Sequence, residues 1–382
     1  MIINGLDKLL LESDPELRRK RIGLIINHTS VDQQLKLSLD VLLSRGFTIK
    51  AIFAPEHGFR GNAAAGEKVA HQVDKKTGIP IYSLYGDSKS PSAESMKDID
   101  AFVFDIQDIG VRFYTYIYTL AYSMETAGKF GLDYYVLDRP NPITGDVIEG
   151  NIIDSKFDSF VGKYGLPVRH GMTVGELATY FNHEFMMGCK LTVIKMEGWE
   201  RTKWFDELGL QWIMPSPNAT GIEMAALYPG TCLFEGTNVS EGRGTTRPFE
   251  MIGAPWIAGE EWCEELQAYQ LDGVIFRPTH FTPTTSKYVG ELCEGLQVHM
   301  VNRKILKPLH VALAMIEALQ TLYPSEFKWM DPIKGRYFID LLAGTDQLRL
   351  CVDRNEKLTD WLKGEESKLE QFKSIRNKYL LY

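Results

Sequence analysis

The chain has few positive charges for its length, and its acidic residues outnumber its basic ones. Its 382 residues include 42 Lys and Arg against 50 Asp and Glu, which gives a formal net charge of −8. Proteins that bind nucleic acids or anionic membranes usually carry basic patches or long basic runs, and the longest basic run here is the four residues 18–21. We therefore expect no nucleic-acid partner and no anionic membrane surface as a partner.

Cysteine is scarce, and the sequence lacks the common ligand motifs. The five cysteines are far apart, odd in number and without metal-ligand spacing, which indicates free and mostly buried thiols. No HExxH motif occurs, so we expect no metal. The GxGxxG and GxxxxGK[ST] patterns are also missing, so we expect no cofactor. An NAD-dependent oxidoreductase on a Rossmann-like sheet is one functional class that these absences disfavour.

Long apolar runs are absent as well. No stretch of about twenty apolar residues occurs, so we expect no membrane span. The residues from Met1 to Gly5 do not show the basic start and apolar stretch of a secretory signal. On that basis we expect a cytoplasmic location, or a periplasmic or secreted one if a leader has been removed.

Four short apolar runs within the first 140 residues each end in a cluster of polar side chains. Continuous apolar runs of this length, separated by helical patterns, are typical of parallel strands that are buried on both faces. In open α/β sheets, ligands bind beyond the carboxyl ends of the strands. The sequence therefore predicts an active site at this edge. The four runs are 21–26, 49–54, 101–104 and 134–137.

Helical patterns fit between these strands and predict the fold class. Thr173 and Glu176 have the spacing of a capping box that opens a helix. Alternating strands and helices with short loops predict an α/β fold, a Rossmann-like, doubly wound and mostly parallel sheet. A barrel of the same repeating unit is the competing fold. We expect a catalytic domain over 1–214, a long ordered loop over the cleft at 215–255, and a smaller C-terminal α/β (α+β) domain over 256–382.

The segment after the second strand is the sharpest candidate for chemistry. Glu56 directly follows a buried run, where a carboxyl group can act as a general acid. His57 would orient it, and Arg60 follows within the same glycine-containing turn. The competing interpretation is a Glu–Arg pair that only fixes the turn. Asp105 and Asp108 follow the third strand and would supply the paired carboxylates of glycosidic chemistry, or one of them caps the next helix.

Further polar residues extend the predicted site as candidate substrate-binding groups. Alternating Gly, Asn, Ser, Thr, Glu and Arg over 234–249 suit a polyhydroxylated ligand, with arginines available for a carboxylate or phosphate. His170 is a weaker candidate, because a lone histidine before a helix is more often structural. The candidates are Asn27, His28, Arg60, Gln107, Arg112, Asp138, Arg139, His170, Asn218, Glu235, Asn238, Glu241, Arg243 and Arg247.

Several of these segments together resemble the exo-β-N-acetylmuramidase family of glycoside hydrolases. They recur in order over most of residues 20–300, and several are seven residues or longer. The matching stretches are 27–30, 54–61, 104–118, 137–142, 169–173, 215–218, 228–238 and 240–245. The resemblance implies a Rossmann-like N-terminal domain, a smaller C-terminal domain with the cleft between them, and a catalytic role for Glu56.

The resemblance also implies a function in cell-wall turnover or recycling. The expected reaction is the release of N-acetylmuramic acid from non-reducing ends of peptidoglycan fragments, with a muropeptide or a MurNAc–GlcNAc saccharide as the small-molecule substrate. A noncatalytic muropeptide-binding or sensing protein with the same cleft is the alternative. Muramic acid carries a lactyl carboxylate, so we expect a cation to recognise it. The candidates are Arg60, Arg112, Arg243 and Arg247, with Arg60 and Arg243 preferred.

Overall fold

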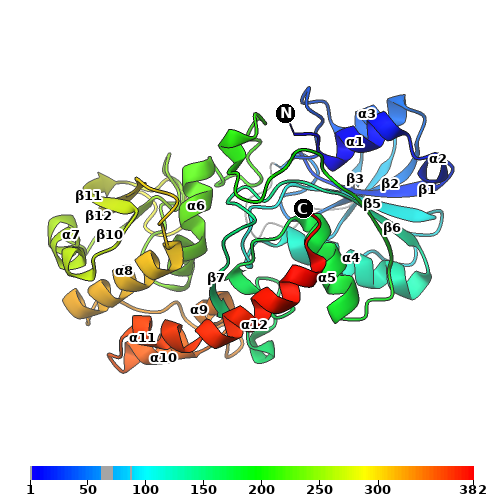
Figure 1. Ribbon diagram of the computed structural model, residues 1–382. Helices are drawn as coiled ribbons and strands as arrows, with labels where there is room; N and C mark the ends of the chain where they lie inside the picture. The colour runs from blue at the N-terminus through cyan, green and yellow to red at the C-terminus, as the bar shows by residue number, and fades with distance from the viewer. Residues whose placement is uncertain (1, 62–71, 87) are drawn as a thin grey trace.

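The computed structural model describes residues 2–61, 72–86 and 88–382, and it divides them into two lobes (Figure 1). The N-terminal lobe is built on a seven-stranded sheet in the order β3-β4-β2-β1-β5-β6-β9, and every neighbouring pair is parallel except β3 and β4. The strands are β1 Arg21–Ile26, β2 Thr48–Ala54, β3 Gln72–Val73, β4 Pro80–Ser83, β5 Ala101–Asp105, β6 Asp133–Leu137 and β9 Lys190–Ile194.

Helices cover both faces of this sheet. Apolar residues of α1, α2 and α3 pack on one face, and those of α4 and α5 pack on the other (Figure 1). This is the doubly wound arrangement predicted from the sequence, and no barrel forms from the described strands. The predicted capping box of Thr173 and Glu176 is present at the start of α5. The helices are α1 Gly5–Glu12, α2 Pro15–Arg18, α3 Ser38–Ser44, α4 Tyr116–Phe130 and α5 Val174–Glu184.

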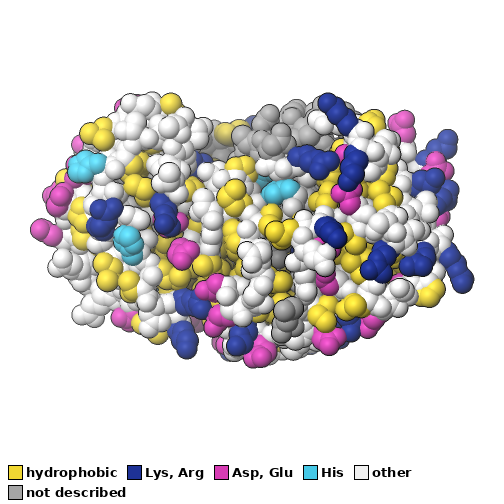
Figure 2. Space-filling view, turned by 90° about the horizontal axis from the view of Figure 1, so that it is seen from above, with side chains coloured by type: hydrophobic (Ala, Val, Ile, Leu, Met, Phe, Trp, Pro, Cys, Tyr) yellow, Lys and Arg dark blue, Asp and Glu magenta, His cyan; other side chains and the backbone are white. Residues whose placement is uncertain are grey.

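The C-terminal lobe is built on a smaller, antiparallel sheet in the order β10-β12-β11. Apolar side chains also gather where the two lobes meet (Figure 2), and one continuous core includes residues of both lobes. The elements are α6 Ile222–Thr231, β10 Met251–Ala254, α7 Gly259–Leu266, β11 Val274–Phe281, β12 Cys293–Met300, α8 Pro308–Leu322, α9 Phe338–Ala343, α10 Gln347–Asp353, α11 Leu358–Gly364 and α12 Glu366–Arg376.

The segment predicted as a loop over 215–255 contains regular structure. Helix α6 and strand β10 both lie within it. Pro229 and Gly230 favour a turn by composition, yet here they lie inside α6. A Cβ atom on Gly230 would come within 1.9 Å of the carbonyl oxygen of Pro308, so the glycine allows α6 to pack closely against α8. Helix packing thus overrides the local signal of these two residues.

Two buried arginines join the lobes. Arg112, expected in the cleft, is instead fully buried, and it donates hydrogen bonds to Asn151 and Leu166 and to two carbonyl oxygens of α9, those of Leu342 and Ala343, at 2.8–3.0 Å. Burial lowers its pKa to about 10. Arg376 at the end of α12 donates hydrogen bonds to the carbonyl oxygens of Gly145 and Gly171. The lobes are therefore connected through α9 and through α12. The short strands β7 Glu149–Ile152 and β8 Pro167–Arg169 form an antiparallel pair, and they lie between β6 and β9 in sequence.

Candidate active site

The carboxyl end of β2 carries Glu56 and His57 into the space between the lobes. Both side chains are buried, and the hydroxyl of Thr115 donates a 2.7 Å hydrogen bond to Oε2 of Glu56. His57 has a φ of +67°, which is an unusual conformation for a residue with a side chain, and Gly58 continues the turn with +75°. Such backbone strain is concentrated at functional sites. The turn therefore holds the carboxyl group just beyond the end of β2.

These residues lie in a cavity of about 540 Å³ that both lobes enclose. We call this cavity the chamber. None of the residues that line it is exposed among those the structure describes. The N-terminal lobe contributes Glu56, His57, Tyr85, Lys89, Tyr114, Thr115 and Tyr116, and the C-terminal lobe contributes Met224, Tyr228, Glu235, Arg243, Phe249 and Phe338.

Aromatic rings form much of the chamber wall. Tyr114 and Tyr116 meet edge to face at 4.9 Å between ring centroids, and Tyr228 of α6 meets Phe249 in the same way at 4.7 Å. The Tyr114 and Tyr228 rings are also in edge contact, at 6.3 Å. Edge-to-face packing fixes ring orientation. The chamber therefore has rigid, largely apolar walls around a small number of polar groups.

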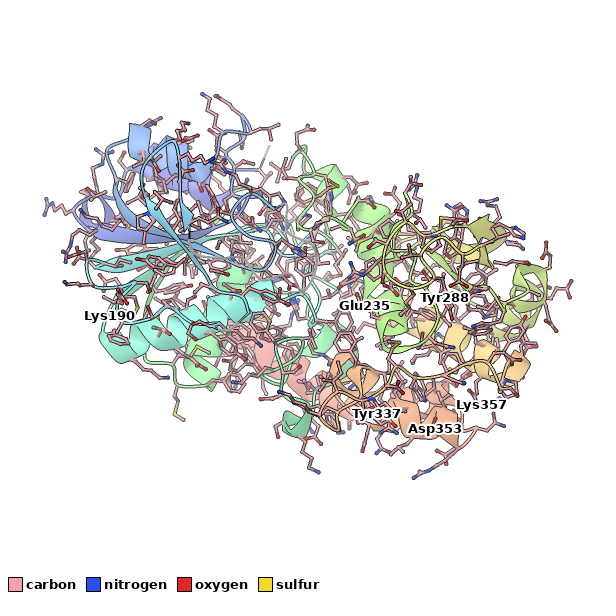
Figure 3. All side chains as sticks on the ribbon, turned by 180° about the vertical axis from the view of Figure 1, so that it is seen from behind. Lys190, Glu235, Tyr288, Tyr337, Asp353 and Lys357 are labelled. Carbon is pink, nitrogen blue, oxygen red and sulfur yellow. The ribbon has the colours of Figure 1, made fainter. Side chains whose placement is uncertain are left out.

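A chain of four charged groups borders the chamber on the C-terminal side. Glu235 lies on the side of the C-terminal lobe that faces the N-terminal lobe (Figure 3). Arg243 contacts Glu235 at 2.9 Å and Glu241 at 3.2 Å, and Lys287 contacts Glu241 at 2.9 Å. The guanidinium group of Arg243 also lies 5.0 Å from the Phe249 ring centroid. Burial raises the pKa of Glu235, although the Arg243 charge opposes this shift.

The loop after β4 supplies two chamber residues that the sequence analysis missed. The ammonium group of Lys89 lies 4.3 Å from the Phe160 ring centroid. Burial lowers the Lys89 pKa, and the Glu56 carboxylate opposes this change. Burial raises the pKa of Tyr85, and the Glu56 carboxylate adds to that shift. The charge of Glu56 thus affects the pKa values of both residues, and they place one cation and one phenol near its carboxyl group.

Comparison with known proteins assigns the chain to a family. A family model described as exo-beta-N-acetylmuramidase NamZ, N-terminal, matches residues 22–223, and its C-terminal counterpart matches residues 226–382. The chain belongs to the exo-β-N-acetylmuramidase NamZ family. It is 46% identical over 379 residues to the peptidoglycan beta-N-acetylmuramidase NamZ of Bacillus subtilis (strain 168), covering 99% of this chain and 91% of that protein.

Two crystal structures of DUF1343 family proteins from Bacteroides fragilis have the same fold as this NamZ-family chain. One has a TM-score of 0.93 at 36% identity, and the other has 0.79 at 34%. Each match covers 100% of this chain and 99% of the other. The family resemblance predicted from the sequence is confirmed, and so is the assignment to the glycoside hydrolases.

The structure brings together about a third of the predicted site residues of this NamZ-family chain. A second, more open cavity adjoins the chamber and shares Asn218, Glu235 and Arg243 with it. Glu241 borders that second cavity. The predicted residues at these two cavities are Glu56, His57, Asn218, Glu235, Glu241 and Arg243.

Asp105 and Asp108 do not line the chamber. Asp105 is fully buried, and its Oδ1 accepts a 2.6 Å hydrogen bond from Nε of Arg139. Asp108 accepts a 2.7 Å hydrogen bond from the backbone N–H of Gly110 and lies 3.5 Å from the His170 ring. Both carboxylates are therefore held by neighbouring groups of the N-terminal lobe.

The other polar groups at the ends of β1, β5 and β6 are held in the same way. Asn27 accepts hydrogen bonds from Thr29, and the His28 ring contacts the carbonyl oxygen of Met214 at 2.6 Å. Gln107 donates to the carbonyl oxygens of residues 108 and 140. Gln107 and Arg139 line a separate cavity of about 190 Å³. The sequence predicted one site, but these groups lie away from the chamber.

Asp138 and His170 also have structural partners. The Asp138 carboxylate accepts hydrogen bonds from the hydroxyls of Thr173 and Tyr382 and from the backbone N–H of Gly175, at 2.7–2.8 Å. Nδ1 of His170 accepts a hydrogen bond from the backbone N–H of residue 172 at 3.2 Å. These contacts fix the start of α5 and the C-terminal tyrosine rather than a ligand.

The remaining candidates lie outside the chamber. Arg60 is 60% exposed in its side chain and pairs with Asp74 at 3.0 Å. Arg247 pairs with Glu250 at 3.2 Å. Asn238 exchanges hydrogen bonds with the backbone of residues 326 and 328. Of the four arginines predicted to recognise a carboxylate, only Arg243 lines the chamber among the described residues.

The described residues, 2–61, 72–86 and 88–382, show neither a metal-binding cluster nor a membrane-spanning helix. No group of three or more His, Cys, Asp or Glu side chains in that part of the chain has an arrangement that could hold a metal ion. No helix there is both long enough and apolar enough to cross a membrane.

Proposed function

We propose that this chain releases N-acetylmuramic acid from non-reducing ends of peptidoglycan fragments, with the sugar bound in the chamber. The observation that carries the proposal is a carboxyl group, Glu56, on a strained turn in an enclosed, aromatic-walled cavity. An enclosed pocket with rigid apolar walls and few polar groups is typical of a small-molecule site. The Bacillus subtilis relative is named as a peptidoglycan beta-N-acetylmuramidase, which supports the same substrate class.

In this proposal Glu56 is the general acid. It donates its proton to the glycosidic oxygen as the bond to the leaving sugar breaks, and the hydroxyl of Thr115 holds the carboxyl group in position. Glycosidic cleavage commonly uses two carboxyl groups around the scissile bond. Glu235 lines the same chamber, so it replaces Asp105 and Asp108 as the second carboxyl group, and Arg243 at 2.9 Å holds it in position.

Lys89 recognises the lactyl carboxylate that distinguishes muramic acid from glucosamine. It lines the chamber, whereas Arg243 is already within hydrogen-bonding distance of two carboxylates. A hydrogen bond to a charged group contributes about 1.5–3 kcal/mol. Lys89→Met should therefore lower kcat/KM for an aryl β-N-acetylmuramide by about tenfold or more, and leave any slow hydrolysis of the matching glucosaminide unchanged.

The decisive experiment is incubation of the protein with MurNAc–GlcNAc followed by chromatographic detection of free monosaccharides. Release of MurNAc and GlcNAc in equal amounts supports the proposal. Binding of the disaccharide without release would instead support the noncatalytic muropeptide-binding alternative. Hydrolysis that removes GlcNAc from GlcNAc–MurNAc, but leaves MurNAc–GlcNAc intact, would contradict the assigned sugar.

A further inference from the structure

The second cavity beside the chamber has a volume of about 1010 Å³ and a different chemical character. We call it the basin. Asn218, Glu235 and Arg243 line both cavities, so the basin lies directly beside the chamber. Among the described residues, none that lines the basin is aromatic. The hydroxyl side chains around it are Thr245, Thr246, Thr282, Thr284, Thr285 and Ser286.

Two loops that are far apart in sequence form the basin, and they meet at Gly244. The backbone N–H and the hydroxyl of Thr284 donate to the carbonyl oxygen of Gly244 at 3.1 and 2.8 Å. Gly244 has a φ of +80°, and a Cβ atom there would lie 2.4 Å from the backbone nitrogen of Thr285. Only glycine permits this approach. The contact fixes the two loops relative to each other.

Lys287 anchors the same loop to the chamber wall. Its ammonium group donates to the carbonyl oxygens of Phe234 and Val239 and to Glu241, at 2.8–2.9 Å. Three acceptors satisfy the three donors of a lysine. The charge of Lys287 is therefore engaged within the protein, and hydroxyl groups are the most numerous polar side chains that line the basin.

The exposed hydroxyls of the basin are available for a ligand. Thr246, Thr282, Thr285 and Ser286 are exposed, and their hydroxyls make no hydrogen bond to any other described residue. Hydroxyl groups both donate and accept hydrogen bonds, so they match the hydroxyl and acetamido groups of amino sugars. The chamber, by contrast, has no exposed lining residue among those described. The pair of cavities thus resembles a closed end followed by an open platform.

We infer that the basin binds the leaving-group side of the glycan, the β-linked amino sugars that follow the scissile bond. The inference rests on the proposed function, because it places the terminal muramic acid in the chamber. The basin is larger than the chamber, so it has room for more than one sugar. In this arrangement the terminal sugar occupies the more sheltered chamber, and the more open basin supports the rest of the chain.

The test compares substrates of increasing length. Hydrolysis is measured for an aryl β-N-acetylmuramide, for MurNAc–GlcNAc and for the peptide-free tetrasaccharide (MurNAc–GlcNAc)₂. We expect kcat/KM to be at least about fivefold higher for the tetrasaccharide than for the disaccharide, because the basin adds hydrogen bonds. Equal values for the two saccharides would overturn the inference.

Basin variants assign that advantage to particular residues. The double variant Thr285→Ala with Ser286→Ala should lose the tetrasaccharide advantage and keep kcat/KM for the aryl muramide within about twofold of wild type. Thr202→Ala is the matched control, because Thr202 is an exposed threonine that lines neither cavity. A double variant that retains the full length dependence would contradict the inference.

A binding measurement separates this inference from the proposed function. Calorimetry with the tetrasaccharide and Glu56→Gln needs no turnover. Weaker binding when the basin hydroxyls are also removed supports the basin assignment, even if the chain hydrolyses no muramide. Unchanged affinity would overturn it. If the basin variants impair only substrates that carry peptide stems, the basin binds peptide and the saccharide assignment is wrong.

Discussion

Strands β2 and β5 lie in the same parallel sheet and both end in acidic residues, yet their ends differ in what the acids contact. Glu56 after β2 lines an enclosed chamber that both lobes form. Asp105 at the end of β5 is fully buried against Arg139. A polar cluster at a strand end therefore does not by itself mark an active site. What matters is whether the strand end borders a cavity, as that of β2 does, or is closed over by neighbouring segments, as that of β5 is.

The position of each strand in the sheet explains the difference. Strand β5 lies between β1 and β6, and the segments after those two strands close over its end. The hydroxyl of Ser30 donates to the carbonyl oxygen of Asp105, and the Gln107 N–H donates to Thr29. Strand β2 lies beside β4. The loop after β4 and the C-terminal lobe enclose the Glu56 side without filling it.

The largest expected effect in this comparison is that of Glu56→Gln on activity. The variant keeps the shape of the side chain and removes its acid function, so turnover of MurNAc–GlcNAc should fall by about 10²–10⁴-fold. Steady-state kinetics provide the measurement, and the thermal midpoint should stay close to that of wild type. Glu223→Gln serves as the control, since Glu223 is an exposed carboxylate on α6. Near wild-type turnover by Glu56→Gln would remove Glu56 from the mechanism.

Asp105→Asn should show the opposite of Glu56→Gln, with lower stability and nearly unchanged activity. It leaves Arg139 buried without its charged partner, and breaking a buried ion pair in this way costs about 3–5 kcal/mol. Urea unfolding should show this loss of stability. Turnover of the fraction that remains folded should stay close to wild type. A stable variant with severely reduced turnover would place Asp105 in the chemistry instead.

The end of β6 offers a smaller, pH-dependent effect. Burial, followed by the nearby Glu176 charge, raises the pKa of Asp138 from 3.8 to about 7. The folded state therefore keeps a proton that the unfolded state loses, so this contribution to stability is full below about pH 4 and is lost as the pH rises to about 7. For one proton, the free energy of unfolding changes by at most about 1.4 kcal/mol per pH unit.

Asp138→Asn tests this contribution through the slope rather than through absolute stability. Burial also raises the pKa of Glu149 to about 7, so the wild-type slope contains both groups. The free energy of unfolding of the variant should fall less steeply between pH 4 and 7 than that of wild type, by up to about 1.4 kcal/mol per pH unit. An unchanged slope would mean that Asp138 is ionised throughout this range.

The sequence predicted the elements whose signals are local. The buried run of β1 and the capping box of α5 both appear as expected. Helix α6 could not be predicted in the same way, because close packing against α8 at Gly230 is a contact between distant segments. Lys89 was missed for a related reason. It follows β4, a strand that is only four residues long and begins with proline, so no strand end was expected there.

The candidate site was predicted in part, and the limit is again physical. Glu56 and Glu235 both line the chamber, although they are far apart in sequence. The sequence cannot show that Arg112 and Arg139 donate their hydrogen bonds to buried acceptors, because those acceptors come from other segments. Residue type identified groups able to bind a substrate. Only the three-dimensional arrangement separates those that face the chamber from those that hold the fold together.

The smallest expected effect distinguishes two cations that follow neighbouring strands. Arg60 was a preferred candidate for the lactyl carboxylate, but its side chain is 60% exposed, pairs with Asp74 and does not line the chamber. Arg60 is the exposed partner of the pair, and the buried Asp74 keeps its hydrogen bonds from Thr77, so Arg60→Met should lower stability by only about 1 kcal/mol and change kcat/KM for the aryl muramide by less than about twofold. The preference for muramide over glucosaminide, measured beside that of Lys89→Met, decides between the two residues. If Arg60→Met loses that preference while Lys89→Met keeps it, the carboxylate is bound at the end of β2 and not by the loop after β4.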